Sequence, residues 1–196
     1  MIRESIEYPE HIGVSDVTTL SREQMMVEMF MEGQSSCMAD EPLGFDIGEP
    51  AALRGQSRGW TPVHYQLGAL ATCTSITIAV VAQDLGFQLG GLRTTIRSLI
   101  DIRGFCDGDT SRKPEYELVE FDLSLDTGEN EERVRELALE ADRRCPQLGL
   151  FHRASIPMHV RWLRKRDGAT VFEQRHHLPD GPTPAETLAV QPEPVA

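Results

Sequence analysis

Apolar and small residues follow one another almost without interruption from Pro62 to Gly86. Thr61 is a favourable N-cap, Pro62 suits the first helical position, and Gly86 stands where helices often end in a glycine. The pattern therefore predicts one helix of about 24 residues, roughly 36 Å long at 1.5 Å per residue. Because its apolar residues occur on every side, we expect this helix to be buried all round instead of amphipathic.

Alternating positions predict two strands before this helix. Methionines and a valine alternate with glutamates over residues 25–32, and Cys37-Met38 begins a returning strand after a glycine-serine turn. The glycine-rich segment 44–60 predicts a loop that leads into the helix. This loop carries two arginines, Arg54 and Arg58.

A second set of strands and a second helix are predicted after the long helix. Apolar and charged residues alternate over residues 92–103, and residues 119–125 show the same alternation, so the two segments are predicted to be antiparallel partners. Asn130 caps an amphipathic helix that ends at Arg143-Arg144. Residues 156–162 are the last predicted strand. This order of elements predicts an α+β fold with an antiparallel sheet and one long central helix.

Length and charge restrict the domain organisation and the partners. A chain of 196 residues is long enough for one domain with a buried core. We expect residues 1–22 to be a weakly ordered extension, residues 23–165 to form the single domain, and residues 166–196 to be a proline-rich, partly disordered tail. The net charge of −12 argues against nucleic acid and acidic membranes as partners, since both require a positive protein face.

The lack of a visible secretory signal and the cysteine content favour a cytoplasmic protein. The N-terminus lacks the apolar segment of a secretory signal, and the apolar run at residues 67–82 is short for a bilayer and reads as a core helix. The cysteines are too few and too scattered for a disulfide scaffold, and none has zinc-site spacing. There are four of them: Cys37, Cys73, Cys106 and Cys145. We therefore expect free, reduced thiols. His176-His177 can bind a metal adventitiously, although exposed histidines in a tail usually have no function.

Two of these cysteines occupy positions where a thiol can either fill space in the core or take part in a reaction. Cys73 lies about three turns inside the long helix, so the dipole of that helix cannot lower its pKa, and a reactive thiolate there needs a cation from elsewhere. Cys145 precedes Pro146 at the start of a predicted helical turn and follows two arginines, which favours a thiolate. A buried free cysteine is more often packing than chemistry, so both interpretations stay open on spacing alone.

Taken together, two motifs are more specific than either thiol. The run P-x-x-x-x-L-x-A-L-A-x-C-T-S at residues 62–75 and the later R-C-P at residues 144–146 resemble the OsmC/Ohr family of osmotically inducible and organic hydroperoxide resistance proteins. The resemblance covers roughly residues 25–165. It implies an OsmC-like branch with antiparallel sheets wrapped around long central helices in an intertwined homodimer.

The resemblance also implies a chemistry and the residues that perform it. It implies a thiol peroxidase that reduces organic hydroperoxides in the oxidative stress response, with no metal or organic cofactor. Cys73 is then the peroxidatic thiol, and Cys145 resolves its sulfenic acid to a disulfide that a cellular dithiol reduces. Arg54, or else Arg58, matches the arginine that stabilises the thiolate in this family.

One position departs from the family pattern. The peroxidases carry a glutamate just after the helix-initiating proline, where this chain has Val63 followed by His64. His64 is a candidate site residue that can hydrogen-bond or carry charge, but it cannot hold a guanidinium as a carboxylate does. The departure supports an alternative function, in which a non-catalytic OsmC-like protein binds an apolar small molecule in the dimer-interface pocket.

Overall fold

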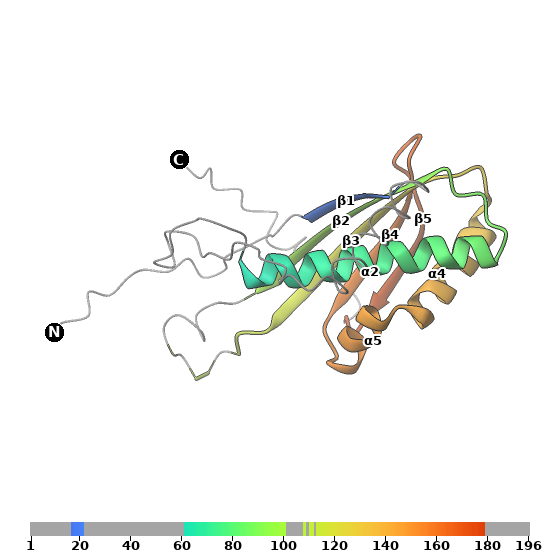
Figure 1. Ribbon diagram of the computed structural model, residues 1–196. Coiled ribbons are helices and arrows are strands. Elements are labelled where there is room, and N and C mark those ends of the chain that lie inside the picture. Colours follow the sequence, from blue (N-terminus) through green and yellow to red (C-terminus); the bar gives the residue numbers. More distant parts are fainter. Residues whose placement is uncertain (1–16, 22–60, 101–107, 109, 112, 179–196) are drawn as a thin grey trace, which may run out of the picture.

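The computed structural model describes residues 17–21, 61–100, 108, 110–111 and 113–178 (Figure 1). The strands predicted at residues 25–32 and from Cys37 and the loop 44–60, with Arg54 and Arg58, lie outside these residues. The elements are β1 (Val17–Ser21), α2 (Pro62–Asp84), β2 (Gly91–Ile100), β3 (Tyr116–Asp126), α4 (Glu131–Arg144), α5 (Pro146–Arg153), β4 (Met158–Arg164) and β5 (Thr170–His176).

The strands form one sheet in the order β1-β2-β3-β4-β5, and the helices lie against one of its faces (Figure 1). β2 and β3 are antiparallel, as predicted, with Ile96 opposite Phe121. The prediction of a wholly antiparallel sheet is wrong at β4, which runs parallel to β3 with Val160 opposite Phe121. The reason is the crossover through α4 and α5, which returns the chain to the end of the sheet from which β3 started.

The core lies between this sheet and the helices. Alternate residues of each central strand point toward the helices and are buried, and α2 packs against β1, β2, α4 and α5. The buried strand residues on this face include Leu92, Ile96, Val119, Phe121, Leu123, Leu125, Met158, Val160 and Trp162. The opposite face is charged: Asp122 accepts hydrogen bonds from Arg97 at 2.8 Å and from Arg161 at 2.6 Å.

The end signals predicted for α2 are confirmed. The Thr61 side chain accepts a hydrogen bond from the backbone N–H of His64, Pro62 is the first helical residue, and Gly86 has a φ of +62°. Among the described helices, only α2 is long and apolar enough to cross a membrane. Its contacts with the sheet and with α4 and α5 identify it as a core helix.

Complete burial of α2 is not reached within one chain. Leu70, Ile78 and Val81 are fully buried, whereas Val80 is 43% exposed. Ala69 is also exposed, and Ile76 is only partly covered. These last three residues recur at roughly helical spacing, so α2 presents a small apolar stripe away from its own sheet.

Both ends of the chain contain a strand that the sequence patterns did not predict. β1 lies within residues 1–22, which were expected to be a weakly ordered extension, and pairs with β2. β5 lies within the expected tail and pairs antiparallel with β4. Val171 and Phe172 of β5 pack against the core. The expectation of a tail from residue 166 is therefore corrected for residues 170–176.

Candidate active site at the Cys73–Cys145 pair

The fold brings together two cysteines that are 72 residues apart in the chain. The sulfur atoms of Cys73 and Cys145 are 3.7 Å apart, and both thiols are free. Cys73 is half-buried on α2, and Cys145 is 2% exposed between α4 and α5. The sulfurs of a disulfide are about 2.05 Å apart, so the two thiols are close neighbours that are not bonded.

The helix junction holds Cys145 in place. Its backbone N–H donates to the carbonyl of Ala141 at the end of α4, and its own carbonyl accepts from Gly149 in α5. Pro146 is the first residue of α5. At this position a backbone N–H has no partner within the helix, so the missing N–H of proline costs no hydrogen bond. The Cys-Pro sequence thus ends one helix, starts the next, and directs the thiol between them toward α2.

Opposing influences act on the Cys73 thiol. Burial raises its pKa, and the neighbouring Cys145 sulfur raises it further because two thiolates would repel each other. The backbone N–H of Gln147 and the side chain of Thr77 lower the pKa, but the net shift is upward. The Thr77 hydroxyl itself donates to the backbone carbonyl of Cys73 at 2.9 Å. Within the described residues, the raised pKa therefore favours the protonated thiol of Cys73, and a further cation is needed to make it a strong nucleophile.

Gln147 is a site residue that sequence reasoning missed. The sequence excluded help from the dipole of the long helix itself, because Cys73 lies about three turns inside it. In the structure, the N-terminus of a different helix, α5, provides the donor. The signal was present in the Cys-Pro-Gln sequence, since a proline at the first helical position leaves the next N–H free to bind a partner.

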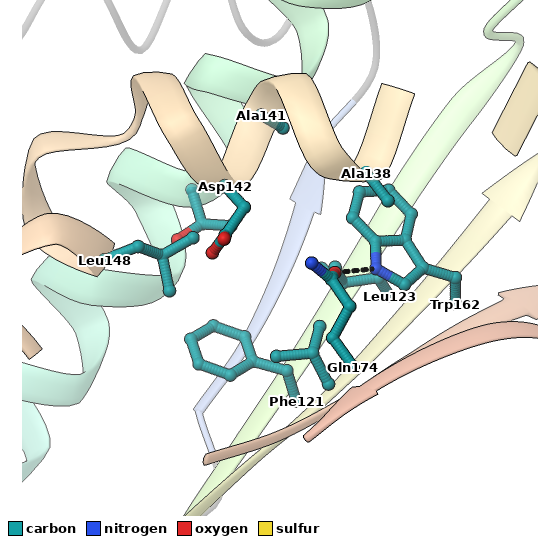
Figure 2. Close-up of a pocket in the computed structure, with 10 residues that line it drawn as sticks. Phe121, Leu123, Ala138, Ala141, Asp142, Leu148, Trp162 and Gln174 are labelled. Carbon is teal, nitrogen blue, oxygen red and sulfur yellow. Dashed lines mark hydrogen bonds between the residues drawn. The ribbon is translucent and has the colours of Figure 1, made fainter. Parts of the chain in front are cut away.

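A small cavity lies beside the thiol pair. The hydroxyl of Thr74 is 3.6 Å from the Cys145 sulfur, and Thr74 also lines a cavity of about 10 Å³. Figure 2 shows its walls, including Phe121 of β3 and Asp142 of α4. Such a volume holds about one water molecule, so it cannot admit an organic substrate.

The other predicted site residues lie farther away or outside the described part of the chain. His64 is in the first turn of α2, where its Nδ1 is 2.7 Å from the Thr61 hydroxyl. It lies nine positions before Cys73, about 13 Å along the helix axis. His64 can therefore influence the thiol only through another group, and the positions of Arg54 and Arg58 stay predictions. The charge of Arg144, next to Cys145, is compensated by Asp84 at 2.6 Å.

Comparisons with known proteins agree with this architecture. The model for the OsmC-like protein family matches residues 55–161. An OsmC-like protein from Mycoplasma pneumoniae has 16% identity and a TM-score of 0.50, over 55% of this chain and 74% of that one. A Legionella pneumophila structure described as an organic hydroperoxide resistance protein OsmC, predicted redox protein and regulator of sulfide bond formation has 18% identity and a TM-score of 0.51. That match covers 63% of this chain and 84% of the other.

No curated protein matches the chain. The two structural matches support the fold. The family model covers more than half of the chain, including both cysteines of the pair and the long helix α2. The chain therefore belongs to the OsmC-like protein family.

Proposed function

We propose that this protein is a thiol-dependent peroxidase that reduces organic hydroperoxides. The observation that carries the proposal is the 3.7 Å separation between the Cys73 and Cys145 sulfurs. At this distance, a sulfenic acid formed on one sulfur has the second thiol as a close neighbour, which resolution to a disulfide requires. Membership of the OsmC-like family and the description of the Legionella structure as a predicted redox protein support the same class of chemistry.

In the first step, Cys73 acts as the nucleophile. It is the better placed of the two sulfurs because it is half-exposed, whereas Cys145 is buried. The Cys73 thiolate attacks the distal peroxide oxygen, so that an S–O bond forms while the O–O bond breaks. The alkoxide leaves and takes up a proton to become the alcohol. The sulfur is oxidised to a sulfenic acid as the peroxide is reduced.

In the second step, Cys145 resolves the sulfenic acid. Its sulfur attacks the sulfur of Cys73, an S–S bond forms, and the departing hydroxide takes the Cys145 proton and leaves as water. A cellular dithiol then reduces the disulfide by thiol–disulfide exchange and restores both thiols. The apolar stripe of α2 that one chain leaves open supports a homodimer, and we propose that the dimer works in the cytoplasm.

Intact-mass analysis tests this proposal directly. One equivalent of cumene hydroperoxide should remove two hydrogen atoms from the reduced chain, and peptide mapping should locate the new disulfide at Cys73 and Cys145. Cys145→Ser should instead gain one oxygen and react with dimedone, because its sulfenic acid has no resolving partner. Cys73→Ser should not react with the peroxide.

A matched control uses the two remaining cysteines. Cys37→Ser and Cys106→Ser should form the disulfide as the unaltered chain does. If the unaltered chain keeps its mass after peroxide treatment, the peroxidase proposal is wrong. The alternative, a non-catalytic protein that binds an apolar small molecule at its dimer interface, then becomes the better explanation, and the substitution of the family glutamate by Val63 and His64 already favours it.

A further inference from the structure

Two histidines and an aspartate meet where α4, α5 and β5 come together. The Nε2 atom of His152 is 2.8 Å from Oδ1 of Asp142, and Nε2 of His176 is 3.9 Å from the same oxygen. One potential ligand atom of each residue lies within 4.8 Å of the other two. The rings of His152 and His176 are in edge contact, with centroids 4.4 Å apart. Three good ligands for a metal ion therefore face one small volume.

One nitrogen of His176 is left without a hydrogen bond in this cluster. Its Nε2 atom is buried, and among the described residues it has no hydrogen-bond partner. The 3.9 Å separation from Asp142 is too long for a hydrogen bond. Burying a polar nitrogen without a partner is unfavourable, and coordination of a cation between the three residues would satisfy it.

We propose that Asp142, His152 and His176 bind a divalent first-row transition metal ion, with Zn²⁺ the best match. Imidazole nitrogens and a carboxylate oxygen are ligands that Zn²⁺ accepts, and catalytic zinc sites often have three protein ligands. Mg²⁺ and Ca²⁺ are disfavoured because they prefer oxygen ligands.

The distances are compatible with such an ion. Ligand atoms about 2.05 Å from a tetrahedral zinc ion lie about 3.3 Å from one another. The separations from Asp142, 2.8 and 3.9 Å, fall on either side of that value, and all three ligand atoms lie within 4.8 Å of one another. Small side-chain rotations can therefore bring the three atoms around a metal, and His152 then exchanges its hydrogen bond to Asp142 for a metal bond.

The position of the site relates it to the thiol pair. Asp142 lies three residues before Cys145, and His152 lies seven residues after it. His176 comes from β5, which lies beyond the residues that match the family model. A bound metal would thus fasten β5 to the segment that positions Cys145. This cluster is a different site from the thiol pair, and its existence does not depend on the peroxidase proposal.

Zinc titration of the full chain, with all four cysteines replaced by serine, tests the proposal. We expect one Zn²⁺ per chain by calorimetry and a higher melting temperature in its presence. Asp142→Asn and His176→Ala should each weaken binding at least about tenfold. His177→Ala is the matched control, because this exposed neighbour contributes no atom to the cluster and its loss should leave the affinity within about twofold.

Two further measurements make the result decisive. The Co²⁺-loaded chain with free thiols should show ligand-field bands without thiolate charge-transfer absorption, which separates this site from the cysteines. If circular dichroism shows that His176→Ala does not fold, His152→Gln is used as the histidine variant instead. Zinc affinity that is unchanged in Asp142→Asn and in a folded histidine variant, or that disappears when the four cysteines are replaced by serine in a folded chain, would overturn the proposal.

Discussion

The backbone N–H of Gln147, in the first turn of α5, acts as a donor toward the thiol of Cys73 in α2. This contact lowers the pKa of Cys73 because a donor stabilises the thiolate more than the thiol. It works against burial and against the neighbouring Cys145 sulfur, which both raise that pKa. The reactivity of Cys73 therefore depends on the first turn of α5 as well as on any arginine that approaches it.

Replacing Gln147 by proline should remove this donor. Proline is tolerated in the first turn of a helix, but it has no backbone N–H, so the pKa of Cys73 should rise and its alkylation by iodoacetamide near neutral pH should slow severalfold. Gln147→Ala keeps the N–H and serves as the control, with an unchanged rate expected. Equal rates in both variants would mean that the contact does not influence the thiol.

The upward pKa shift of Cys73 predicts how the stability of the folded protein depends on pH. Because the folded protein holds the proton more tightly than the unfolded chain does, Cys73 contributes stability that is fully present below the unfolded thiol pKa. This contribution is lost as the pH rises through the folded pKa. Unfolding in urea, compared between the natural chain and Cys73→Ser, should show a stability difference that falls with rising pH in the alkaline range. A difference that is constant with pH would contradict the shift.

The arginine predictions concern residues outside the described part of the chain. Arg54→Ala or Arg58→Ala should slow alkylation of Cys73, because a guanidinium near the sulfur favours the thiolate. Lysine at the effective position should restore only part of the rate, since its ammonium lacks the planar fork. His64→Glu should speed oxidation of Cys73 by peroxide if a carboxylate is needed to hold that arginine. Indifference to all three residues would make Cys73 a packing residue.

Truncation distinguishes β5 from the residues that follow it. Ending the chain after Arg166 removes β5, including Phe172, which packs on the core, and Gln174, which accepts a hydrogen bond from Trp162 at 3.0 Å. Loss of this strand should lower stability by at least about 2 kcal/mol. Ending the chain after Leu178 should leave the melting temperature nearly unchanged. Thermal denaturation of both truncations makes the comparison, and equal melting temperatures would mean that β5 contributes little.

The open stripe of α2 predicts a dimer contact. Val80 is 43% exposed in one chain, and a second chain that covers it would bury an apolar side chain. Val80→Glu would then place a charge in the contact and should shift sedimentation toward monomer at micromolar concentration. Gln83→Glu adds the same charge at an exposed position of the same helix and should remain dimeric. A natural chain that sediments as a folded monomer would contradict the homodimer.

Local interactions made much of this fold predictable from the sequence. The Thr61 and Asn130 side chains cap α2 and α4 through residues three positions away, so their signals are readable without knowledge of the rest of the molecule. The alternation in β2 and β3 reflects burial of one face and predicted both strands. The family motif around Cys73 depends on the same kind of short-range order, and it identified the fold correctly.

Contacts between distant segments were decided only by the tertiary structure. The parallel pairing of β3 with β4 follows from a crossover whose direction no periodicity records, and β5 alternates too weakly to stand out from a polar tail. The motif implied a partnership between Cys73 and Cys145, but only packing of α2 against α5 sets their distance and brings Gln147 to the sulfur. Likewise, His176 reads as a tail histidine until β5 pairs with β4, because only that pairing places it beside Asp142 and His152.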